Sequence, residues 1–218
     1  MTRQRWFLIG AVAIGTLTLW SLRPPYIPKQ TPSAISPTRT FDIRHSTFDI
    51  PTILPTDPVR GLQDTPLTII EFGDFTCPSC IDAEAMLTEL RNQYGPQLRI
   101  VWKDFPVLDR LTNSRRTHIA ARCAQRQQRF WEYHDAVLAE QPRDDSARAT
   151  IAGQLGLDAV SFASCLEQEQ TAALVDAGTV EAEQLQLRSA PTFSVNGEWL
   201  EAHPTVDDFR DILDRALR

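Results

Sequence analysis

The chain has 218 residues and a formal net charge of −6 at pH 7, from 28 acidic and 22 basic side chains. This acidic balance, without a stripe of lysine and arginine, argues against nucleic acid as a partner. No repeat of domain-building length is present, so we expect one domain with a core of its own.

The first predicted element is a membrane anchor at residues 1–22. An uncharged, mostly apolar run extends from Trp6 to Leu22 and follows Arg3 and Arg5. Its length is at the short end for a membrane-spanning helix, and no small-residue cleavage site follows it. We therefore expect an uncleaved signal anchor rather than a cleaved signal peptide. The preceding arginines favour a cytoplasmic N-terminus, which places the rest of the chain in the periplasm or at the cell exterior.

Residues 23–56 are predicted to be a tether. Prolines recur at positions 24, 25, 28, 32, 37, 51 and 55. Proline-rich segments form extended spacers rather than packed cores. Residues 57–218 are then left as the folded domain.

The motif Cys77-Pro78-Ser79-Cys80 lies between a predicted strand and a predicted helix. Residues 67–72 are apolar and β-branched, as in a buried strand, and residues 81–90 are rich in helix formers. Cys77 is therefore expected at a helix N-terminus, where unpaired backbone N–H groups and the helix dipole stabilise an anion. A thiolate is such an anion, and it is the form of cysteine that attacks disulfides.

Changes in hydrophobic period predict the later elements. We expect the first helix to end at Gly95, a strand at 98–102, and a block of helices at about 110–187 in which the helical pattern from Asn113 runs on for a long way. A hairpin around Asn196-Gly197 and a last helix at 206–217, with a capping box at Thr205 and Asp208, complete the chain. This order predicts an α/β fold with a mixed central sheet and an inserted helical domain.

Four cysteines allow three disulfide pairings. Cys77 and Cys80 are close enough in sequence to be each other's partners, which leaves Cys123 with Cys165. An extracytoplasmic location would permit this second, structural bridge. The alternative is a pair of buried thiols that pack as small apolar groups.

The segment from Asp57 to Cys80, with Glu71-Phe72-Gly73-Asp74-Phe75-Thr76 before the first cysteine, resembles the DsbA-like thiol–disulfide oxidoreductases. The segments 130–135 (Phe-Trp-Glu-Tyr-His-Asp) and 190–197 (Ala-Pro-Thr-Phe-Ser-Val-Asn-Gly) are similar to two further signatures of that family, in the same order. The resemblance covers about residues 56–218. It implies a thioredoxin fold that carries an inserted helical domain.

The resemblance also implies roles at matching positions. Cys77 would be the exposed attacking thiol of low pKa, and Cys80 the buried partner that resolves the mixed disulfide. Pro191 would be a cis-proline beside the cysteines, although many relatives carry Thr or Val where this chain has Ala190. Glu71 matches an acidic residue that lies under the cysteines. We expect it to help proton transfer, with a plain strand-end carboxylate as the alternative.

The two residues inside the motif favour an oxidant. Proline comes first between the cysteines in the oxidising relatives, as Pro78 does here, and proline is well tolerated early in a helix. The N–H groups of Ser79 and Cys80 can then point at the sulfur of Cys77. A thiolate stabilised in this way favours the reduced protein, so the disulfide form is a stronger oxidant.

The sequence therefore predicts a membrane-tethered, extracytoplasmic oxidoreductase that donates disulfides to secreted proteins, without a cofactor or metal. The partners implied by the resemblance are reduced secreted or membrane proteins and a membrane reoxidase of the DsbB or vitamin-K-epoxide-reductase (VKOR) type. A reductase or isomerase on the same fold, a metal-binding module and a module that holds peptides without turnover remain as alternatives. Zinc is disfavoured because Cys123 and Cys165 are far apart in sequence and form no second close pair.

Overall fold

The computed structural model describes residues 50–107, 113–200 and 204–218. The predicted anchor and most of the predicted tether lie outside these residues. Within the described ranges, no helix is both long enough and apolar enough to cross a membrane.

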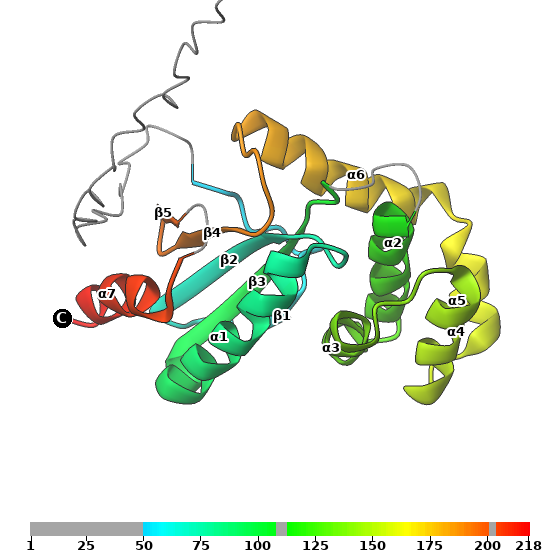
Figure 1. Ribbon diagram of the computed structural model, residues 1–218, viewed down its shortest axis with the longest axis horizontal. Helices are drawn as coiled ribbons and strands as arrows, with labels where there is room; N and C mark the ends of the chain where they lie inside the picture. Colours follow the sequence, from blue (N-terminus) through cyan, green and yellow to red (C-terminus); the bar gives the residue numbers. More distant parts are fainter. Residues whose placement is uncertain (1–49, 108–112, 201–203) are drawn as a thin grey trace, which may run out of the picture. The chain divides into compact units, whose positions relative to one another are not determined.

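A five-stranded mixed sheet forms the centre of the described domain, in the order β1-β3-β2-β4-β5 (Figure 1). Strands β2 and β3 run parallel, and every other pair is antiparallel. The central strand β2 is buried along nearly its whole length, as its apolar and β-branched sequence requires. The strands are β1 (Val59–Arg60), β2 (Leu67–Gly73), β3 (Leu98–Asp104), β4 (Thr192–Val195) and β5 (Glu198–Leu200).

Two helices pack on one face of the sheet, and a helical block is inserted between β3 and β4 (Figure 1). The two are α1 (Pro78–Tyr94), followed by the 3-10 turn η1 (Gly95–Gln97), and α7 (Val206–Ala216). The block consists of α2 (Asn113–Arg126), α3 (Phe130–Glu140), α4 (Asp145–Gln154), α5 (Ala159–Leu166) and α6 (Glu169–Gln184). The predicted thioredoxin-like α/β fold with a mixed sheet and a helical insertion is confirmed.

The helical pattern from Asn113 is divided into two helices, α2 and α3, by a break that the sequence analysis did not place. The chain breaks after α2 at Gln128, which adopts the left-handed conformation with φ 60°. The N–H of Arg129 donates a hydrogen bond to the carbonyl of Ala124 (2.9 Å), and the N–H of Gln128 donates one to the carbonyl of Gln125 (2.9 Å). These two bonds form a Schellman motif. Glutamine carries no turn signal, so the sequence pattern concealed the break.

Two short predicted motifs are confirmed by the backbone. Asn196 and Gly197 both have positive φ, 49° and 89°, as the tight turn of a two-residue hairpin requires. At the start of α7, the side chains of Thr205 and Asp208 each accept a hydrogen bond from the other residue's backbone N–H, which completes the capping box.

The segment between β2 and the cysteine motif is anchored in the core of the helical block. The Phe75 ring is fully buried and its centroid lies 4.7 Å from that of Trp102 on β3. Gly73 passes so close to the same indole that an added Cβ would lie 2.4 Å from it. The sheet and the block therefore share a core at this point, and the shared core fixes the chain just before Cys77.

Candidate active site

Cys77 is the N-cap residue of α1, and Pro78 occupies the first helical position. No side chain caps this helix end, so its backbone N–H groups are available to the sulfur. A hydrogen bond from the Cys80 thiol and bonds from the amides of Cys80 and Ser79 lower the pKa of Cys77 to about 6, although burial opposes them. Near neutral pH the site therefore holds a thiolate at the position the sequence predicts.

Cys80 lies one helical turn further in and is 2% exposed. Its sulfur accepts a hydrogen bond from the backbone N–H of Asp74 (3.3 Å). The hydrogen bond that it donates to Cys77 raises its pKa, and burial and the charge of Glu71 add to the effect. Both cysteines are free thiols here, and their opposite pKa changes assign the anion to Cys77.

Cys77 is less exposed than expected. The sequence predicts an exposed attacking thiol, whereas Cys77 is 7% exposed. The covering group is the segment before β4: the sulfur of Cys77 lies 3.2 Å from the carbonyl oxygen of Ala190, to which the protonated thiol donates. The peptide bond between Ala190 and Pro191 is cis. The structure thus brings Pro191 and Ala190 to the cysteines from 113 residues away in the chain.

A hollow of about 210 Å³ opens beside these residues. Its lining combines α1 with the cis-proline segment and β4, through Ser79, Ala83, Met86, Pro191 and Phe193 among others. An apolar hollow next to a reactive sulfur can hold a side chain of a bound peptide.

Glu71 lies on β2 and is almost fully buried. Burial raises the pKa of its carboxyl well above the usual range, and the charges of Glu84 and Cys77 raise it further. A carboxyl with a raised pKa that interacts with both cysteines is suited to proton transfer.

Residues 54–215 match the family model described as Thioredoxin. The chain belongs to this thioredoxin family.

Two solved structures share the fold of this chain. A thioredoxin-like oxidoreductase from Silicibacter pomeroyi is 25% identical, with a TM-score of 0.68 over 75% of this chain and 94% of that one. Oxidised BdbD from Bacillus subtilis is 20% identical, with a TM-score of 0.70 over 78% of this chain and 97% of that one.

A curated relative of different length is a protein named Na⁺/H⁺ antiporter NhaA 3 from Salinispora tropica. It is 34% identical over 152 residues, which are 66% of this chain and 23% of that protein. The chain thus spans about a quarter of the length of the curated relatives it matches.

The other two cysteines of this thioredoxin-family chain form a disulfide. Cys123 on α2 and Cys165 on α5 are joined with an S–S distance of 2.05 Å, and both are buried. A substrate protein cannot reach these sulfurs, so the bridge is structural. In the described ranges, no three His, Cys, Asp or Glu side chains are grouped so as to hold a metal ion.

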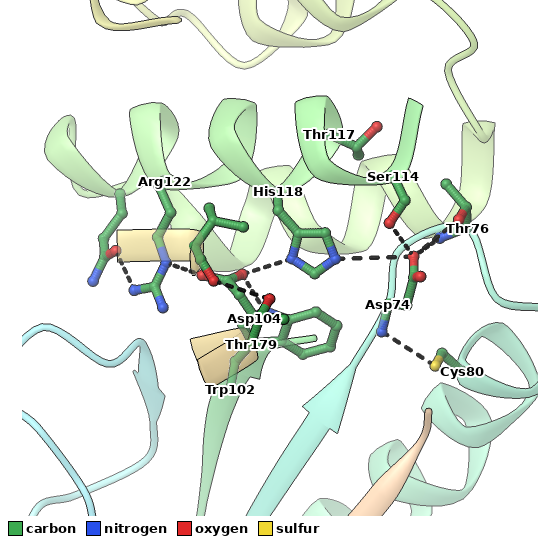
Figure 2. A network of polar contacts seen from close by, with 12 residues as sticks. Asp74, Thr76, Cys80, Trp102, Asp104, Ser114, Thr117, His118, Arg122 and Thr179 are labelled. Carbon is green, nitrogen blue, oxygen red and sulfur yellow. Dashed lines mark hydrogen bonds and ion pairs between the residues drawn. The ribbon is translucent and has the colours of Figure 1, made fainter. Parts of the chain in front are cut away.

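Asp74 is a further member of the site, to which the sequence analysis gave no role of its own. Its carboxylate accepts hydrogen bonds from the backbone N–H of Val107 (2.8 Å), the N–H and hydroxyl of Thr76 (2.9 Å each) and the hydroxyl of Ser114 (2.7 Å). Figure 2 shows that it also faces His118 of α2, which the sequence did not single out as functional. The available signal was an ionisable residue three positions before the cysteine motif.

Proposed function

We propose that this chain is a membrane-tethered, extracytoplasmic thiol–disulfide oxidoreductase that donates disulfides to secreted proteins. The observation that carries the proposal is the low pKa of Cys77 beside the protonated, buried Cys80. A stabilised thiolate stabilises the reduced enzyme, so the Cys77–Cys80 disulfide gives up its oxidising equivalents readily. A reductase would need a less stabilised thiolate at Cys77.

In the forward reaction a substrate thiolate attacks the sulfur of Cys77 in the disulfide. A Cys77–substrate S–S bond forms, the Cys77–Cys80 bond breaks, and Cys80 leaves as a thiolate that takes up a proton. Glu71 is the proposed source of that proton, because its carboxyl has a raised pKa and its charge acts on Cys80.

A second substrate thiolate then attacks the substrate sulfur of the mixed disulfide. The substrate disulfide forms and Cys77 leaves as the stabilised thiolate, so two electrons pass from substrate to enzyme. The backbone at Ala190 and the hollow beside Pro191 are the proposed docking points for the substrate chain, because both adjoin the attacked sulfur.

The tether and the partners are part of the same proposal. Residues 1–22 are the proposed anchor and residues 23–56 the proposed spacer. A location outside the cytoplasm fits the structural disulfide Cys123–Cys165, since such bridges persist in oxidising compartments. The reduced enzyme needs an electron acceptor, for which we propose a membrane reoxidase of the DsbB or VKOR type.

Disulfide transfer to a reduced, unfolded substrate protein tests the proposed chemistry. The oxidised full chain should oxidise the substrate, whereas Cys77→Ser and Cys80→Ser, neither of which can form the Cys77–Cys80 disulfide, should be inactive. The matched control is the double variant Cys123→Ala/Cys165→Ala, which lacks the other two sulfurs and should still transfer disulfides. Transfer by Cys77→Ser, or none by the wild type, would contradict the proposal.

Fractionation of cells that produce the full chain tests the proposed anchor. The wild-type chain should sediment with membranes and need detergent for release, whereas a variant without residues 1–22 should not. Release of the wild-type chain by salt alone would argue against a spanning anchor.

A further inference from the structure

A buried row of charged side chains connects the cysteine motif to the helical block (Figure 2). Its members are Asp74, which follows β2, Asp104 at the end of β3, and His118 and Arg122 of α2. Asp74, Asp104 and His118 are fully buried, and Arg122 is 3% exposed. Isolated charges are very costly to bury, so their placement together indicates that they compensate one another.

His118 lies between the two carboxylates. Its Nδ1 is 2.7 Å from Oδ1 of Asp104, and its Nε2 is 3.9 Å from Oδ1 of Asp74. Ionised carboxylates only accept hydrogen bonds, so a favourable contact on both sides requires a proton on each ring nitrogen. The geometry therefore calls for a positively charged imidazolium.

The electrostatic environment agrees with this protonation state. Burial alone would lower the pKa of His118, but the hydrogen bond to Asp104 and the charges of Asp104 and Asp74 raise it. Burial likewise opposes ionisation of both carboxyls. The pKa of Asp74 is nevertheless lowered by His118, and that of Asp104 by Arg122 and His118. Two negative and two positive groups thus face one another.

Asp74 contacts both cysteines through its backbone. Its backbone N–H donates to the sulfur of Cys80 (3.3 Å), and its carbonyl accepts from the N–H of Cys77 (3.1 Å). Its side chain is bound to Ser114, four residues before His118 on α2. The position of Asp74 relative to the cysteines therefore depends on its contacts with α2.

We propose that His118 is a positioning residue for disulfide exchange, which balances the charges of Asp74 and Asp104 and holds Asp74 in contact with both cysteines. This inference rests on the proposed function, since it concerns the oxidising strength of the same site. With a neutral residue at position 118, Asp74, Asp104 and Arg122 would leave one uncompensated negative charge near the Cys77 thiolate. That charge would destabilise the reduced enzyme and make its disulfide a weaker oxidant.

The test compares His118→Gln with His134→Gln, a matched control. His134 is also buried, and its ring packs against the same two aromatic rings as His118, those of Phe75 and Trp102. Its Nδ1, however, contacts the exposed Asp135 rather than the buried row. Both variants remove an aromatic ring from this core, but only one removes the charge between Asp74 and Asp104.

Two readouts separate positioning from packing: the pKa of Cys77 from thiolate absorbance, and the equilibrium with glutathione at pH 7. For His118→Gln we expect the pKa of Cys77 to rise by about one pH unit and the equilibrium to move about fivefold toward the oxidised enzyme. For His134→Gln we expect the pKa of Cys77 to stay within about 0.3 pH units of wild type and the equilibrium with glutathione within about twofold. Equal values for the two variants would overturn the proposal.

A second measurement covers the case in which His118→Gln does not fold. In nitrogen-15 NMR spectra of the reduced wild-type protein at pH 7, His118 should show two protonated ring nitrogens. A neutral His118 ring would overturn the proposal. Neither experiment depends on disulfide transfer by the wild type, so failure of the proposed function would be seen separately, as a wild-type enzyme that does not oxidise substrates.

Discussion

At the residue scale, Glu71 is the ionisable group that burial perturbs beneath the cysteines. When its carboxyl ionises, the new charge raises the pKa of Cys77, because the two groups interact. Replacement of Glu71 by Gln removes the ionisation of this carboxyl, so only the thiol of Cys77 then titrates at the site. We expect the pH profile of Cys77 alkylation to lose its second step at higher pH and to become a single titration with its midpoint at about pH 6.

The control for this prediction is Glu89→Gln, on the same helix as the cysteines. Glu89 is exposed and forms an ion pair with Arg210. Its removal should leave the alkylation profile as it is in the wild type. If Glu71→Gln also left the profile unchanged, Glu71 would be a strand-end carboxylate with no part in proton transfer.

The low pKa of Cys77 also predicts a pH dependence of stability. The pKa of Cys77 is lower in the folded reduced protein than in the unfolded chain, so ionisation of this thiol stabilises the fold. The stabilisation is complete at a pH above the ordinary thiol pKa, and it is lost as the pH falls through about 6. Below about pH 8 Cys80 is protonated in both the folded and unfolded states, so it does not change the free energy of unfolding with pH in this range. We expect the stability of the reduced protein, relative to the oxidised one, to increase from about pH 5 to about pH 8.

Urea denaturation of both redox forms across this pH range measures the difference. The comparison cancels groups far from the cysteines, which titrate alike in both forms. A difference that is flat with pH, or that decreases as the pH rises, would show that the Cys77 thiolate is not stabilised in the fold.

At the element scale, α6 approaches β3 through a glycine. A Cβ at Gly178 would lie 2.5 Å from the carbonyl oxygen of Asp104, so only glycine permits this distance. We expect Gly178→Ala to lower the free energy of unfolding by about 1–3 kcal/mol, because the helix must move away from the strand.

The matched control is Gly153→Ala on α4, where an added Cβ would have no neighbour within 4 Å. Alanine at that position should stabilise the helix by roughly 0.5–1 kcal/mol. The two variants make the same chemical change, so an equal effect in chemical denaturation would contradict the close approach of α6 and β3.

The disulfide between α2 and α5 is a further feature at this scale. It joins residues 42 positions apart in the chain. Its removal in Cys123→Ala/Cys165→Ala should lower the free energy of unfolding by about 4 kcal/mol on the chain-entropy estimate. Chemical denaturation of the oxidised proteins measures this loss, and an unchanged midpoint would argue against a stabilising bridge.

At the scale of the whole molecule, the sequence could predict what depends on local pattern. The strand before Cys77, the Asn196-Gly197 turn and the capping box at Thr205 each have a local signal, and the structure agrees with all three. The short strand β1 and the break at Gln128 have none, because pairing and tertiary contacts decide them. The row from Asp74 to Arg122 escaped prediction for a similar reason, since it joins three separate elements.

A partial signal for that row was nevertheless present. His118 and Arg122 are four residues apart, so they share one face of α2, and Ser114 lies on the same face one turn earlier. Polar residues that recur at helical spacing among alanines indicate a buried polar face. Their partner Asp104, however, comes from the last residue of β3, and only the fold brings it to α2.

The central claim, that the Cys77–Cys80 pair is a disulfide donor, is tested most directly by its redox equilibrium with glutathione. We predict a reduction potential above about −200 mV, nearer to the value of about −120 mV for DsbA than to that of thioredoxin. A potential near about −270 mV, the value for thioredoxin, would contradict the claim and assign the chain to the reductases.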